Sequence, residues 1–126
     1  MPAYFNNVVY YGAVGDHLRA FSIANAKLTT PASSMTAGTF PYPGTTPSIS
    51  ANGTAAGIVW VVENNSSGGI LHAYDATNLG TELYNTNQAA NSRDHFADNK
   101  FITPMIANGK VYVGTPNSVA VFGLLP

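Results

Sequence analysis

The chain has no cysteine and very little charge. The absence of cysteine from its 126 residues excludes disulfides, thiolate catalysis and zinc–thiolate sites. Charged residues make up 9% of the sequence, far below the roughly 25% of an average soluble domain. No run of lysine or arginine occurs, and the formal net charge is -1. The sequence therefore has no electrostatic attraction for nucleic acid or for an anionic membrane, and we expect neither partner.

Long apolar runs and targeting signals are also missing. No apolar stretch approaches the roughly 18 residues needed to cross a bilayer, and the chain does not open with a basic segment followed by an apolar one. We therefore expect neither a membrane anchor nor a signal peptide in this chain. Hydrophobic residues still make up 45% of the sequence. That is enough for a core without a metal or a disulfide, and we expect a single domain over residues 1–126.

An internal repeat organises the sequence. Residues 2–12 align without gaps with residues 104–114, and a third copy runs from 47 to 62 with a few extra residues in its turn. Each copy reads as a strand, an Asn or Gly turn, and a second strand of β-branched and aromatic residues, which predicts a β-hairpin. A third strand is predicted after each hairpin, over residues 18–21, 71–74 and 119–122.

The repeat predicts an all-β fold. A fourth, outer strand is expected in the first two copies, from about residue 27 to 36 and from about 81 to 88, and no room remains for one in the third. Four short strands per unit, without helical apolar spacing, are typical of β-propeller blades built from four-stranded antiparallel sheets. We therefore expect a partial propeller of three blades with almost no helix. The blade boundaries fall at about 1–43, 44–99 and 100–126, and the proline-rich residues 40–47 connect the first two.

Residues 71–84 read Leu-His-Ala-Tyr-Asp-Ala-Thr-Asn-Leu-Gly-Thr-Glu-Leu-Tyr. They resemble the blade signature of pyrroloquinoline-quinone repeat propellers, in which Ala-x-Asp, then Gly, then Trp mark the third strand, its turn and the fourth strand. This copy has one additional residue before Gly80, and Tyr84 stands where the family has the Trp that docks each blade on its neighbour. Residues 93–125 resemble the closing segment of secreted bacterial proteins of this superfamily. The resemblance implies a parent protein in the periplasm or outside the cell.

Three blades leave two flat apolar flanks open, and such faces are usually interaction sites. We expect a non-enzymatic module that associates with itself, two copies pairing head to tail to close a six-blade ring. The third blade either keeps an unpaired edge or receives a segment such as 27–40 exchanged between chains. Two alternatives stay open, namely a fragment of a quinone-dependent dehydrogenase propeller and a carbohydrate-binding propeller.

No phosphate loop, nucleophile elbow or paired-carboxylate motif is present, so enzyme activity has no support in the sequence. Three blades also cannot supply the ring of ligands that a bound quinone and its calcium would need. We therefore assign no catalytic residue, no cofactor-binding residue and no metal ligand.

The densest polar cluster contains Arg93, Asp94, His95 and Asp98, in the long link between the second and third blades. As a binding site, a histidine flanked by carboxylates could hold a metal or relay a proton. A single histidine without a second one at ligand spacing is weak evidence for a metal. We prefer the structural interpretation, in which Arg93 and Asp94 bridge adjacent blades and cap turn backbone, and keep the four residues as candidates for binding.

Other polar and aromatic positions have structural interpretations. His72 is expected to be an ordinary strand-surface or partly buried histidine, and Asp75 to accept hydrogen bonds from turn N–H groups. Tyr10, Trp60 and Tyr112 take equivalent positions on the second strands. An aromatic row could bind sugars by stacking, but a repeated position favours a packing layer between blades.

Overall fold

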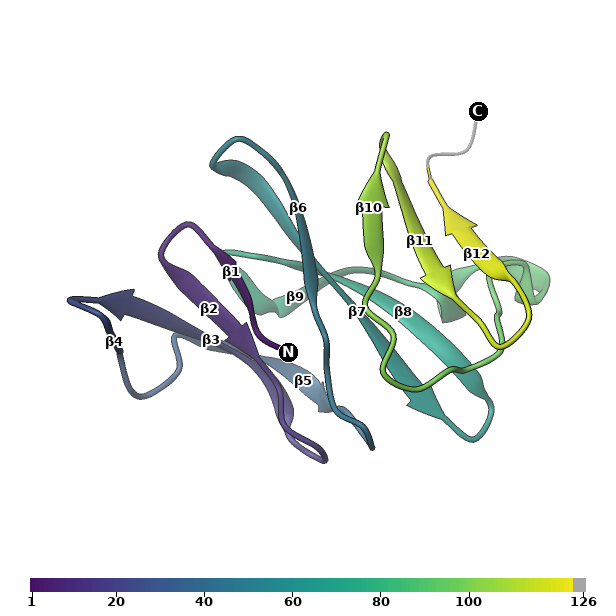
Figure 1. The fold of residues 1–126 in the computed structure, drawn as a ribbon, viewed down its shortest axis with the longest axis horizontal. Coiled ribbons are helices and arrows are strands. Elements are labelled where there is room, and N and C mark those ends of the chain that lie inside the picture. The colour runs from purple at the N-terminus through teal and green to yellow at the C-terminus, as the bar shows by residue number, and fades with distance from the viewer. Residues whose placement is uncertain (124–126) are drawn as a thin grey trace.

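The computed structural model describes residues 1–123 and contains three antiparallel sheets that follow one another along the chain (Figure 1). The first sheet contains β1 (Ala3–Phe5), β2 (Val8–Tyr11), β3 (His17–Ala24), β4 (Lys27–Leu28) and β5 (Ser34–Thr39). The second contains β6 (Ser48–Asn52), β7 (Ala55–Asn65), β8 (Gly68–Asp75) and β9 (Asn78–Asn85). The third contains β10 (Met105–Ala107), β11 (Lys110–Gly114) and β12 (Val119–Phe122).

The prediction of an all-β protein is confirmed. Apart from the strands, residues 1–123 contain only two 3-10 turns, η1 (Thr86–Gln88) and η2 (Ala90–Ser92). No sheet in this part of the chain closes on itself. Within the same residues, no helix is long and apolar enough to cross a membrane. The last three residues of the predicted third blade, 124–126, lie outside the described residues.

The predicted hairpins form around tight turns. Asn6 and Asn7 connect β1 to β2 with φ values of 50° and 62°, and Asn108 and Gly109 connect β10 to β11 with values of 50° and 70°. Two consecutive residues with positive φ define the type I′ turn, whose twist matches that of the flanking strands. Asn and Gly enter this conformation at low cost, which is why these sequences turn here.

The third strands lie where the repeat predicts them, but the fourth strands differ in detail. The expected strand over 27–36 is divided into β4 and β5, with Pro31 in the gap. Proline has no N–H to donate to a ladder, so it interrupts the pairing with β3. In the second sheet β9 runs from Asn78 to Asn85, earlier than the expected 81–88, because residues 86–88 turn away as η1. Within residues 1–123, β12 pairs with β11 alone.

Two apolar cores lie between successive sheets. The first core joins the first and second sheets, and its buried members are Tyr10, Leu18, Ala20, Phe40, Val59, Val61, Tyr74, Ala76 and Leu79. The second core joins the second and third sheets around Val62, Leu71, Val111 and Val113, with Trp60, Phe96, Ile102, Ile106, Ala120 and Phe122 packed against them. The second sheet therefore uses the alternation of side chains along its strands to present one face to the first sheet and the other to the third.

The aromatic row takes part in this packing at two of its three positions. Tyr10 is 1% exposed, and its hydroxyl donates to the carbonyl of Ala76 across the first core at 2.7 Å. Trp60 packs against the second core. Tyr112 pairs with Met105 and Val121, on the side of the third sheet opposite Val111 and Phe122. The packing prediction is confirmed for Tyr10 and Trp60, whereas Tyr112 lies on the outer face of the third sheet.

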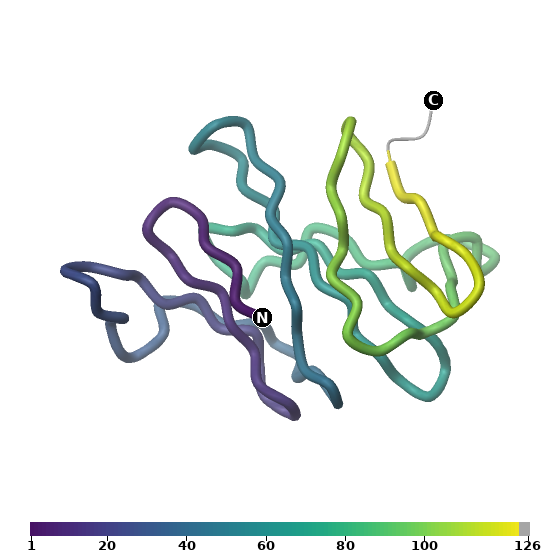
Figure 2. The backbone as a smooth tube through the Cα atoms, in the orientation of Figure 1, coloured from purple at the N-terminus to yellow at the C-terminus, as the bar shows by residue number. Residues whose placement is uncertain are grey.

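Each link between sheets contains a phenylalanine that the sequence comparison did not single out, Phe40 buried and Phe96 partly buried. Phe40 accepts from the N–H of Gly15 at 2.7 Å, and Phe96 accepts from the N–H of Gly69 at 3.0 Å, both through their carbonyls. A Cβ on Gly69 would lie 2.2 Å from the ring of Phe96, so only glycine admits the ring there. Figure 2 traces the chain through both links, which lead directly into β6 and β10.

Candidate functional site

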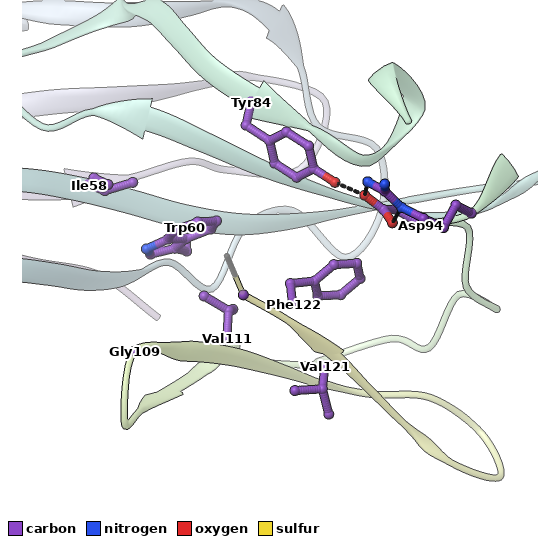
Figure 3. A pocket seen from close by; sticks show the side chains of 10 residues that line it. Ile58, Trp60, Tyr84, Asp94, Gly109, Val111, Val121 and Phe122 are labelled. Carbon is purple, nitrogen blue, oxygen red and sulfur yellow. Dashed lines mark hydrogen bonds and ion pairs between the residues drawn. The ribbon is translucent and has the colours of Figure 1, made fainter. Parts of the chain in front are cut away.

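A cleft of about 640 Å³ lies between the second and third sheets (Figure 3). The second sheet contributes Ile58 and Trp60 from β7 and Tyr84 from β9. The third sheet contributes Val111 from β11 and Phe122 from β12. The remaining lining residues are Arg93, Asp94, Gly109, Val121 and Gly123. The cleft is thus mainly aromatic and aliphatic, with one polar corner.

The polar corner is built from two of the predicted candidates and one residue of β9. Arg93 and Asp94 form a two-point ion pair, with Nε 2.7 Å from Oδ1 and Nη2 3.0 Å from Oδ2. The hydroxyl of Tyr84 donates to the same carboxylate at Oδ2. Asp94 is 16% exposed through its side chain and Arg93 is 54% exposed. Both carboxylate oxygens therefore accept hydrogen bonds, while the guanidinium is half exposed to solvent.

These contacts move the pKa values of Asp94 and Tyr84 further from neutral pH. Hydrogen bonds from Arg93, and then from Tyr84, lower the pKa of Asp94 to about 2. Desolvation, followed by the bond to Asp94, raises the pKa of Tyr84 to about 12. Asp94 is thus an anion and Tyr84 a neutral donor throughout the physiological range. This arrangement suits binding by hydrogen bonds and apolar contact rather than acid–base chemistry.

The structure separates the other two candidates from the cleft. His95 lines a smaller hollow of about 340 Å³ together with Phe96 and residues of the β7–β8 turn. Asp98 is partly buried and lines neither cavity. The structural interpretation expected Arg93 and Asp94 to bridge the second and third sheets. Instead, their side-chain hydrogen bonds connect the segment that follows β9 to Tyr84 of the second sheet. No group of three His, Cys, Asp or Glu residues in the described part of the chain is arranged to hold a metal ion.

Sequence reasoning missed a second polar cluster, on the face of the second sheet that packs on the first. His72 lies between two carboxylates, with Nδ1 2.6 Å from Glu82 and Nε2 3.2 Å from Glu63. Its ring stacks on Tyr74 with centroids 5.8 Å apart and meets the edge of Phe40 at 5.7 Å. The side chain is 11% exposed, so it is partly buried as expected. The two glutamates come from neighbouring strands, and only the strand register brings them to the histidine.

Asp75 has the role that the sequence predicted. Its carboxylate accepts from the backbone N–H and the hydroxyl of Thr77, both at 2.7 Å, and these bonds lower its pKa. Asp75 therefore stabilises the turn between β8 and β9.

The fold and the cleft define an all-β protein of three antiparallel sheets packed in series, with a largely apolar cleft at the second sheet-to-sheet junction. Comparisons with protein-family models, with curated proteins and with solved structures find no match to the chain.

Proposed function

We propose that the three sheets are blades of a partial β-propeller and that the chain is a non-enzymatic unit that associates with a second copy of itself. The order of the strands supports the first part. β1 lies beside β6 and β6 beside β10, while the outer strands β5 and β9 lie beside each other (Figure 1). First strands gathered on one side and fourth strands on the other are typical of blades around a common axis.

The outer face of the first sheet is apolar and exposed. The register of β1 to β5 places a set of residues on the side opposite Tyr10 and Ala20. Four of them are about half exposed or more, namely Tyr4, Tyr11, Leu28 and Met35. Val9, Phe21 and Ile23 are partly exposed on the same side. The only charges among the paired residues of this face come from Arg19, which forms an ion pair with Asp16.

The outer face of the third sheet has a similar character. Met105, Val119 and Val121 are 58%, 59% and 51% exposed, and the register places Tyr112 beside them. Lys110 lies at the end of the same face. Contiguous apolar surface of this kind usually marks an interaction site.

In the repeat, these two faces correspond to the two faces that pack together between the first and second sheets. This correspondence is the main support for the proposal. Tyr112 is the counterpart of Tyr10, which covers the second sheet from the first. Tyr11 is the counterpart of Val61, which lies on the face of the second sheet that packs against the first. The outer face of the third sheet is therefore suited to cover the outer face of the first sheet in another copy. Two such contacts per dimer would close a ring of six blades.

We also propose, from the resemblance of residues 93–125, that the parent protein is bacterial and acts in the periplasm or outside the cell. The resemblance of residues 71–84 to pyrroloquinoline-quinone repeats supports the assignment of the second sheet as a blade. Asp75, at the acidic position of that signature, accepts hydrogen bonds in the turn as described above.

The proposal is tested by the solution mass of the chain and of two variants. Sedimentation equilibrium is expected to give twice the chain mass of 13.2 kDa. Met35→Lys on the outer face of the first sheet and Met105→Lys on that of the third should each weaken the dimer, because a buried unpaired ammonium is costly. Leu83→Glu is the matched control, since Leu83 is 49% exposed but lies on the second sheet. A wild-type monomer at the highest soluble concentration would contradict the proposal.

Mixing the two variants tests the head-to-tail geometry. A mixed dimer of Met35→Lys and Met105→Lys chains keeps one contact between two unaltered faces, so the mixture should associate more tightly than either variant alone. A dimer through like faces predicts instead that one of the two variants has no effect. That result would exclude the ring and leave self-association of another kind.

A further inference from the structure

We propose that the free edge of β12 and the adjoining cleft accept an extended segment of a partner polypeptide, which adds a fourth strand to the third sheet. The site uses a strand edge and the junction of the second and third sheets. It uses the backbone edge of β12, whereas the proposed self-association uses side chains on the outer faces, those of Val119 and Val121 among them. The two proposals therefore involve different groups of β12 and are separated by the variants below.

The chain contains two internal examples of the contact. β5 pairs with β3 and β9 pairs with β8. In both, a buried threonine meets the same position of the third strand. Thr36 Oγ1 accepts from the N–H of Leu18 at 3.1 Å, and Thr86 Oγ1 accepts from the N–H of Leu71 at 3.2 Å. Both threonines are at most 1% exposed, so each fourth segment satisfies a buried donor as well as extending the sheet.

Val119 is the counterpart of Leu18 and Leu71 in the third sheet. The carbonyl of Ser118 accepts from the N–H of Thr115 at 2.9 Å, on the side of β11. Because successive residues of a strand alternate their backbone groups between its two edges, Val119 and Val121 direct theirs away from β11. Within residues 1–123 nothing pairs with this edge. It is an open row of donors and acceptors of the kind that templates strand addition.

The cleft lies beside this edge and supplies the side-chain contacts. Phe122 of β12, Tyr84 of β9 and Trp60 of β7 line it together (Figure 3). A segment paired with β12 would therefore lie next to β9, as β5 does on the other side of the second sheet. Its cleft-facing side chains would bury aromatic surface, and its backbone would pair with Val119 and Val121.

The internal examples define the chemistry of the occupant. It is an extended segment antiparallel to β12, with threonine or serine opposite Val119 and an apolar side chain over the cleft. Backbone hydrogen bonds would supply affinity, and the cleft and the hydroxyl position would supply selectivity. Proline is excluded from the pairing positions because it lacks a donor.

A peptide from the chain itself is the probe. Residues 33–40, Ser-Ser-Met-Thr-Ala-Gly-Thr-Phe, contain β5 with its buried threonine. Trp60 is the only tryptophan and lines the cleft, so its fluorescence should change saturably as the peptide binds. Hydrogen exchange should slow at the amides of Val119 and Val121, whereas the amide of Ala120, which is directed toward β11, should change little.

The control that leaves the protein intact is a peptide with Thr36→Val, which keeps the shape of threonine without its acceptor. It should bind about 3- to 10-fold more weakly, the usual value of one hydrogen bond. In the protein, Val119→Pro removes the donor from the free edge and should abolish binding, with folding checked by circular dichroism. Met35→Lys should leave peptide binding unchanged, which separates this site from self-association.

Three results would overturn the proposal. The first is that saturating peptide changes neither Trp60 emission nor the exchange of Val119 and Val121. The second is that a scrambled peptide of the same composition, or the valine peptide, binds as tightly as the original. The third is that Val119 and Val121 become protected in the Met35→Lys variant alone as its concentration rises, which would make the occupant of the edge a second copy.

Discussion

At the scale of single residues, the ionised state of Asp94 depends on neighbours from two segments of the chain. Arg93 is adjacent in sequence, whereas Tyr84 comes from β9. Because the pKa of Asp94 is lower in the folded chain than in the unfolded one, the carboxylate stabilises the fold fully above about pH 4. This contribution is lost as the pH falls through the folded value of about 2.

Tyr84→Phe removes one of the two donors to Asp94. The pKa of Asp94 should rise, while remaining below its ordinary value because Arg93 still binds it. Carboxyl-carbon NMR titration measures this shift directly. Tyr4→Phe is the control, because Tyr4 donates to Asn7 on an exposed hairpin and does not contact Asp94. An Asp94 titration that is identical in the wild type and in Tyr84→Phe would show that the tyrosine does not hold the carboxylate.

At the scale of elements, each fourth segment is attached to its third strand by a buried hydroxyl as well as by ladder hydrogen bonds. Thr36 and Thr86 perform this role although Thr36 lies within β5 and Thr86 begins η1. The repetition indicates that the third-strand N–H needs a partner wherever it is buried, because an unsatisfied buried donor is costly.

Thr86→Val should lower the free energy of unfolding by about 1–3 kcal/mol, because valine fills the space of threonine but leaves the N–H of Leu71 without an acceptor. Chemical denaturation measures the change. Thr81→Val on the exposed part of β9 is the matched control and should stay within about 0.5 kcal/mol of the wild type. Equal effects at the two positions would mean that the hydroxyl of Thr86 contributes nothing beyond its volume.

At the scale of the whole molecule, three sheets share two cores in series, and each end of the series presents an apolar face. The middle sheet is covered on both sides, whereas the first and third are each covered on one side by the described residues. Burial of the two end faces would therefore add stability that a single copy lacks.

If the chain associates as proposed, its melting temperature should rise with protein concentration, because association stabilises only the folded state. Calorimetry over a wide concentration range measures this dependence. Met35→Lys, which removes the contact from both interfaces of the dimer, should melt at a temperature that does not depend on concentration. A constant melting temperature for the wild type would argue against self-association through these faces.

Much of the secondary structure could be predicted because it is locally encoded. Asn6-Asn7 and Asn108-Gly109 specify tight turns, and alternating β-branched and aromatic residues specify the strands beside them. In the first sheet, the expected fourth strand is divided at Pro31. This division follows from the same local chemistry, although the repeat alone suggested one continuous strand. Arg93 and Asp94 were found because charge is scarce in this chain and clusters are conspicuous.

The rest depended on contacts between distant residues. The register of β7, β8 and β9 places His72 between Glu63 and Glu82, and no local sequence pattern predicts this contact. The cleft likewise forms only where Trp60 and Tyr84 of one sheet face Phe122 of another. The sequence by itself determined the strands, their turns and the repeat, because propensity and alternation act over a few residues. Only the tertiary structure decided which faces are covered, which edge is open and which side chains share the cleft, because strand register and sheet packing join residues far apart in the chain.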